Sequence, residues 1–90
     1  MAIRRSRFNK AAYAAKLMEL RIVIRDGLLD GKTHRIMKMM ASYVTAVYGI
    51  APEGMDLEGA LFAVDDCREI ANDIKTRFRR HLKYIEVECL

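Results

Sequence analysis

Clusters of basic side chains are the first feature of this chain that could do chemistry. The N-terminal cluster consists of Arg4, Arg5, Arg7 and Lys10. The C-terminal cluster consists of Lys75, Arg77, Arg79, Arg80 and Lys83. Guanidinium and ammonium groups neutralise phosphate charge, and arginine also bonds phosphate in a bidentate way. We therefore expect both clusters to bind an anion, the first of them as a basic N-terminal arm over about residues 1–8.

The charge is segregated along the chain. The formal net charge is +4, but residues 1–25 sum to +6 and residues 51–74 sum to −6. Residues 26–50 contribute +1, and residues 75–90 contribute +3. The acidic segment can pair with basic groups of the same chain, of a second copy or of a partner, and the charges alone do not choose among these.

Three carboxylates at a spacing of four residues, Asp65, Glu69 and Asp73, are the candidate for a metal site. Such a row can hold Mg²⁺ or Ca²⁺, but metal sites in helical bundles usually combine several helices and a Glu-x-x-His pair, which this sequence lacks. We expect a solvated face or an ion-pair partner for the first helix, with no metal and no cofactor.

Signatures of catalysis are missing from the sequence. Residues 31–33 read Gly-Lys-Thr, but the first glycine that a phosphate-binding loop needs is absent. His34 and His81 have no serine, cysteine or carboxylate at motif spacing. We therefore expect a protein that is not an enzyme, the alternative being a small helical enzyme that gathers arginines around an anionic substrate.

The two cysteines bear on the compartment. They cannot build the disulfide framework of a small secreted domain, and we expect Cys67 to act as a small buried apolar group and Cys89 to be exposed. No run of about 18 apolar residues could span a membrane. A cytoplasmic location follows, with mitochondrial import as a minor alternative because residues 1–18 are basic and contain no acidic residue.

Helical spacing of apolar residues predicts the first two elements. Over residues 8–29 the apolar positions advance by three or four, at Tyr13, Leu17, Leu20, Ile24 and Leu28. Over residues 32–48 they fall at Ile36, Met40, Tyr43 and Val47, with Thr33 as a candidate N-cap and Gly49 as the stop. Both segments are therefore predicted to be helices.

The same spacing predicts a third and longer helix, which begins at Asp56. Its heptad seam, interpreted as a helix-packing or oligomer surface, comprises Leu57, Ala60, Val64, Cys67, Ala71, Ile74, Phe78, His81 and Ile85. An apolar seam of this length exceeds what one small bundle buries, so a homo-oligomer is expected. His81 would then set the register of the helices as a polar residue within the seam.

Together these elements predict a single helical domain over residues 1–90, an all-α three-helix antiparallel bundle with long first and third helices. Its expected function is non-catalytic binding of nucleic acid or a nucleoprotein assembly through the two basic clusters. One alternative is a small inhibitor or adaptor that occludes a protein target, a character common among small virus-encoded proteins. A further alternative is an oligomer that binds a small anionic ligand such as a nucleotide between its subunits.

Overall fold

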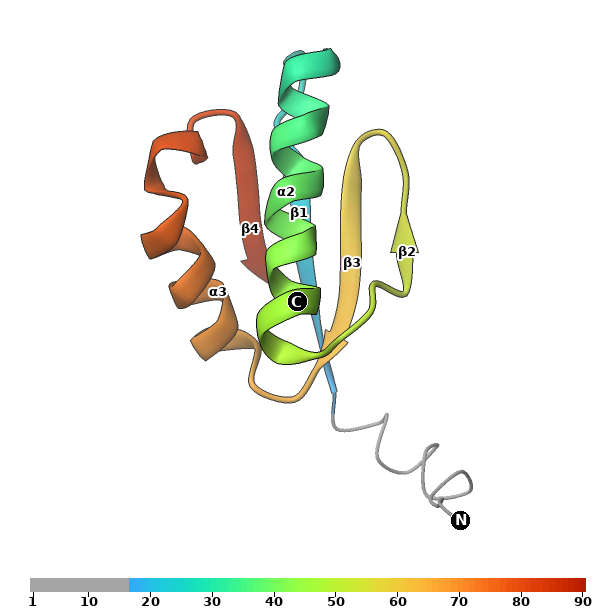
Figure 1. The fold of residues 1–90 in the computed structure, drawn as a ribbon, viewed down its shortest axis with the longest axis vertical. Helices are drawn as coiled ribbons and strands as arrows, with labels where there is room; N and C mark the ends of the chain where they lie inside the picture. The colour runs from blue at the N-terminus through green and yellow to red at the C-terminus, as the bar shows by residue number, and fades with distance from the viewer. Residues whose placement is uncertain (1–16) are drawn as a thin grey trace.

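The computed structural model describes residues 17–90 as a four-stranded antiparallel sheet with two helices on one face (Figure 1). Its elements are β1 (Met18–Ile24), α2 (Gly31–Tyr48), β2 (Gly54–Met55), β3 (Gly59–Val64), α3 (Cys67–Arg77), the 3₁₀ turn η1 (Arg79–His81) and β4 (Ile85–Cys89). The strand order is β2-β3-β1-β4. This β-α-β-β-α-β succession is the split βαβ, or ferredoxin-like, arrangement. The predicted all-α three-helix bundle is therefore wrong.

The chain over Met18–Ile24 forms the central strand β1 where the spacing had predicted a helix. The buried side chains Leu20, Ile22 and Ile24 alternate with partly exposed ones, which is the period of a half-buried strand. Leu20 and Ile24 are four residues apart, so they satisfy a helical period as well. The strand conformation is favoured because β1 forms backbone hydrogen bonds on both sides, with β3 and with β4. Residues 25–29 of the predicted first helix form a non-helical connection after β1, and its residues 8–16 lie outside the described residues.

The predicted second helix is confirmed as α2. Its N-cap is Asp30 and not Thr33, because Oδ1 of Asp30 accepts a 2.7 Å hydrogen bond from the Thr33 amide. Gly49 ends the helix in the left-handed conformation, with φ of 70°. Met37, Met40 and Val44 turn inward and bring the helix onto the sheet.

The predicted long third helix is wrong, because residues 56–85 contain β3, α3, η1 and the first residue of β4. In β3 the buried residues Ala60, Phe62 and Val64 alternate with half-buried ones. Ile85 and Val87 alternate with glutamates in β4. Apolar residues at a spacing of three and four run through this region because β3, α3 and β4 each bury side chains in the same core.

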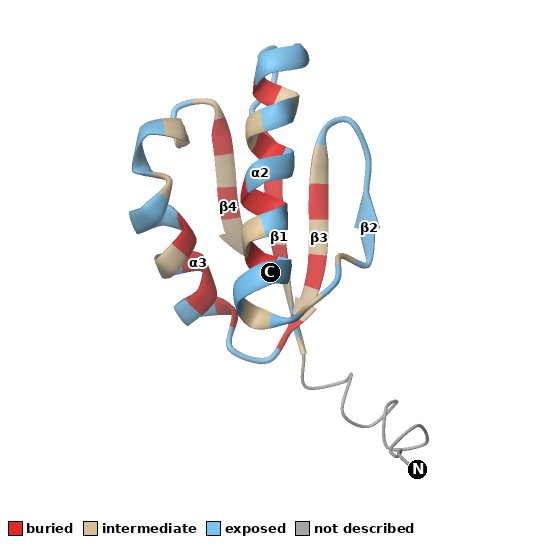
Figure 2. Ribbon diagram, in the orientation of Figure 1, coloured by how far each residue is buried: buried red, intermediate tan, exposed pale blue. Residues whose placement is uncertain are grey.

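The core lies between the sheet and the two helices, as the buried segments in Figure 2 show. The predicted seam contributes Ala60, Val64, Cys67, Ala71, Ile74 and Ile85 to this core. Phe78 and His81 of the seam are half-buried, and Leu57 is 63% exposed. Most of the seam is therefore covered within one chain and needs no second copy to bury it.

The two cysteines form a disulfide, Cys67–Cys89, which joins the start of α3 to the end of β4. Cys67 is buried as expected but is bonded to Cys89, and Cys89 is half-buried where the sequence predicted exposure. The sequence did not predict this disulfide, because the two cysteines are far apart in the chain and come together only when β4 pairs with β1 beside α3. Among residues 17–90, no helix is both long and apolar enough to cross a membrane.

Candidate functional site

The C-terminal basic cluster consists of five exposed residues, here called the α3–η1 surface. It comprises Lys75 and Arg77 in α3, Arg79 and Arg80 in η1, and Lys83 before β4. No acidic residue interrupts the sequence between Asp73 and Glu86. None of the five cations takes part in an ion pair with another residue in the described part of the chain. The structure thus keeps these charges accessible to an anion.

Two aromatic residues position this surface against the fold. Phe78 ends α3, its amide donating a 2.8 Å hydrogen bond to the Ile74 carbonyl, and its ring meets the Tyr43 ring edge to face at 5.4 Å. The Arg77 guanidinium lies 4.8 Å from the centre of the Tyr43 ring, a cation–π contact. Because Tyr43 belongs to α2, the base of the surface is fixed to both helices.

A carboxylate beside this surface joins the same two helices. Oδ2 of Asp73 accepts hydrogen bonds from the hydroxyls of Tyr43 and Tyr48. These bonds, that from Tyr48 foremost, and the nearby Arg77 charge hold the pKa of Asp73 below its ordinary value. The hydrogen bond to Asp73 in turn raises the pKa of Tyr48 to about 12. Asp73 is therefore a structural anion and not a free one.

The carboxylates Asp65, Glu69 and Asp73 do not form a continuous row along one helix. Asp65 precedes α3, and Asp73 is bonded to the two tyrosines. Glu69 has a raised pKa, first because of its hydrogen bond with Asp66. Over residues 17–90, no group of three histidine, cysteine or acidic side chains is placed to hold a metal ion.

The N-terminal cluster Arg4, Arg5, Arg7 and Lys10 lies outside the described residues. Residues 17–90 contain all twelve acidic side chains and eleven of the sixteen basic ones, so their net charge is −1. The described domain is not basic as a whole. Five of its eleven basic side chains belong to the α3–η1 surface.

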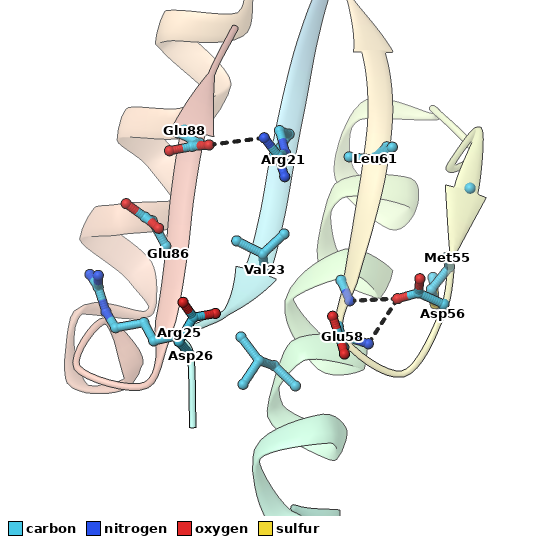
Figure 3. Close-up of a pocket in the computed structure, with 13 residues that line it drawn as sticks. Arg21, Val23, Arg25, Asp26, Met55, Asp56, Glu58, Leu61, Glu86 and Glu88 are labelled. Atoms are coloured by element: carbon cyan, nitrogen blue, oxygen red, sulfur yellow. Dashed lines mark hydrogen bonds and ion pairs between the residues drawn. The ribbon is translucent and has the colours of Figure 1, made fainter. Parts of the chain in front are cut away.

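The face of the sheet opposite the helices carries a groove of about 670 Å³ that the sequence alone did not reveal (Figure 3). Its charged lining residues are Arg21, Arg25, Asp26, Asp56, Glu58, Glu86 and Glu88, a net charge of −3. Arg21 pairs with Glu88 at 3.4 Å, and Nε of Arg25 donates to the Leu82 carbonyl. This face is acidic, so a phosphate would be repelled from it.

The histidines are placed as structural residues. Nδ1 of His34 lies 3.1 Å from the Leu57 carbonyl oxygen, which links α2 to the turn between β2 and β3. His81 is half-buried, its ring 6.4 Å from that of Phe78. No hydrogen bond within residues 17–90 joins either imidazole to a serine, a cysteine or a carboxylate.

Comparison with known proteins adds no assignment: no family model, curated protein or solved structure matches this chain. The topology is familiar, but one topology serves many unrelated functions. Function must therefore be argued from the charges and exposed surfaces of the described residues.

Proposed function

We propose that this protein binds the phosphate backbone of nucleic acid, free or within a nucleoprotein assembly, through the α3–η1 surface and without catalysis. The observation that carries the proposal is the presence of five exposed cations in residues 75–83 with no acidic residue among them. The groove on the opposite face of the sheet is lined by residues with a net charge of −3, which favours binding of a polyanion elsewhere.

The break between α3 and η1 makes a helix-stabilising role a weaker explanation of the cluster. Basic side chains are favoured in the last turn of a helix, which accounts for Lys75 and Arg77. Arg79, Arg80 and Lys83 lie beyond the end of α3, where the dipole of that helix no longer explains them. These three cations are the ones that a phosphate-binding role explains best.

Sequence-independent binding is the expected mode. Phe78, the aromatic residue between Arg77 and Arg79, is half-buried and packed against Tyr43 and so is not free to stack on a base. The described side chains on the open face of the sheet include no aromatic residue of the kind that stacks bases in RNA-recognition sheets. Phosphate contacts without base contacts give affinity but little preference among sequences.

The test is the salt dependence of binding to a 20-base-pair duplex, followed by fluorescence anisotropy. Arg79→Gln/Arg80→Gln removes two phosphate contacts and should make the slope of log K against log[salt] shallower by about 1.8. The matched control is Arg35→Gln/Lys38→Gln, which removes two exposed charges from α2 and should leave the slope unchanged. Equal slopes for all three proteins, or no binding at 50 mM salt, would refute the proposal.

The N-terminal cluster is tested in the same assay. Arg4→Gln/Arg5→Gln/Arg7→Gln measures how much of the affinity the proposed basic arm supplies. A mononucleotide added as competitor examines the small-ligand alternative, since a nucleotide pocket would release the duplex at micromolar competitor. Sedimentation of the free protein tests the predicted homo-oligomer.

The compartment stays a prediction as well. In a reducing cytoplasm or mitochondrial matrix, Cys67 and Cys89 should be thiols, whereas an oxidising compartment would preserve their bond. Alkylation of the protein in intact cells, followed by mass analysis, distinguishes the two. Recovery of alkylated thiols supports the cytoplasmic prediction.

A further inference from the structure

One edge of the sheet has no partner strand in the described part of the chain. β4 pairs with β1 alone, so the backbone on its other side is unpaired by any strand. The opposite edge of the sheet is β2, a strand of only two residues. Short edge strands resist pairing with other chains, whereas β4 has five residues.

The register shows which backbone groups face outward. Leu90 and Glu19 exchange both of their hydrogen bonds, and antiparallel pairing alternates, so Glu86 and Glu88 also bond towards β1. The amides and carbonyls of Ile85, Val87 and Cys89 therefore point away from β1. These three residues form a row of donors and acceptors at the outer edge.

Glutamates flank this edge on the open face of the sheet. Arg21 of β1 stands directly opposite Glu88 and forms an ion pair with it at 3.4 Å (Figure 3). A cationic side chain on a strand added to the other side of β4 would lie opposite Glu86 or Glu88 and could form the same kind of cross-strand ion pair. Two β4 edges paired antiparallel about Val87 would instead oppose carboxylates to carboxylates, which disfavours a second copy.

We propose that the β4 edge binds an extended segment of a partner protein that carries arginine or lysine at alternate positions. Backbone hydrogen bonds from Ile85, Val87 and Cys89 supply affinity, and Glu86 and Glu88 select the cationic side chains. This site is separate from the α3–η1 surface and does not depend on it. A protein with both would join a basic partner to nucleic acid.

The β4 edge is already ordered in the free protein. Ile85 and Val87 are 0% and 4% exposed, with their side chains in the core. The Cys67–Cys89 disulfide fixes the far end of β4 to α3. A preformed edge lowers the cost of ordering the site on binding.

The experiment uses the full chain and a ten-residue peptide in which arginine and threonine alternate. A peptide of the same composition, with its arginines in one block, controls for charge alone. We expect the alternating peptide to bind at least fivefold more tightly in calorimetry. It should also slow hydrogen exchange at the amides of Ile85, Val87 and Cys89 while leaving α3 unchanged.

Two charge-matched variants complete the test. Glu86→Gln/Glu88→Gln should weaken binding of the alternating peptide about fivefold. Glu53→Gln/Glu58→Gln changes the net charge equally near β2 and should have no effect. Equal binding of both peptides, equal weakening by both variants, or protection at other amides would overturn the proposal. Protection of the same three amides by self-association would assign the edge to a second copy and would also overturn it.

Discussion

The hydroxyl of Tyr48, at the end of α2, donates a 2.5 Å hydrogen bond to Oδ2 of Asp73 in α3. The same oxygen accepts a 2.8 Å bond from Tyr43, which also packs against Phe78 and Arg77. One carboxylate thus holds the two helices together next to the α3–η1 surface. Removal of this carboxylate should lower the stability of the fold and change the position of Arg77.

The ionisation of Tyr48 reports this contact directly. Its phenolic pKa of about 12 should return towards 10.0 in Asp73→Asn, because the neutral amide no longer opposes formation of the phenolate. Ultraviolet titration of each protein, with the curve of the same protein carrying Tyr48→Phe subtracted from it, isolates this one phenol. Glu69→Gln is the control and should change the value only slightly, since Glu69 is the last of the causes that raise it. An unchanged Tyr48 pKa in Asp73→Asn would contradict the hydrogen bond.

The stability of the protein in acid should depend on Asp73. Its pKa is lowered in the folded state, first by Tyr48, so the folded state favours the carboxylate. The resulting stabilisation is fully present above the unfolded pKa of about 3.9 and is lost as the pH falls through the folded value. Urea unfolding of the wild type and Asp73→Asn between pH 2 and pH 7 should show a difference in free energy that shrinks in acid. A difference that is constant over this range would exclude this linkage.

Loss of the disulfide should lower the free energy of unfolding by about 3 kcal/mol, from the closure of a loop between residues 22 positions apart. Cys67→Ala/Cys89→Ala measures this in urea without reductant. The wild type in excess dithiothreitol should approach the variant. Identical unfolding curves for the oxidised and reduced wild type would show that the bond contributes nothing.

Gly59 is the glycine least able to accept a side chain. A Cβ there would lie 2.6 Å from Cγ1 of Val23 and 2.9 Å from the Ile22 carbonyl oxygen. Gly59→Ala should therefore cost about 1–3 kcal/mol through overpacking between β1 and β3. Gly54→Ala is the matched control, since no atom lies within 4 Å of its added Cβ. Similar melting temperatures for the two variants would count against the close packing at Gly59.

The sequence predicted α2 well, because this helix is specified by short-range information. The apolar spacing within α2, the positive-φ Gly49 after it and the later Pro52 all indicate a helix that ends near residue 48. The cluster at residues 75–83 is visible as a run of residues, although only the structure shows that α3 ends within it at Phe78.

The strands were missed for a physical reason. Leu20 and Ile24 fit both a helical and a strand period, and β1 becomes a strand because residues far along the chain pair with it. The groove and the unpaired edge of β4 could not be predicted from the sequence either. Both depend on the order of the strands in the sheet, which the sequence pattern does not reveal. Pairing over such distances leaves no local signature.

The central position of β1 has a consequence for how the chain folds. β1 is the first described strand, yet one of its two neighbours is β4, the last. Until β4 pairs with β1, one edge of β1 bonds only to water, and the side chains of Leu20, Ile22 and Ile24 are incompletely covered. Contacts between such distant parts of a chain close slowly. The interval before this closure is when newly made molecules are most prone to associate with one another, and help from a chaperone would matter most at that stage.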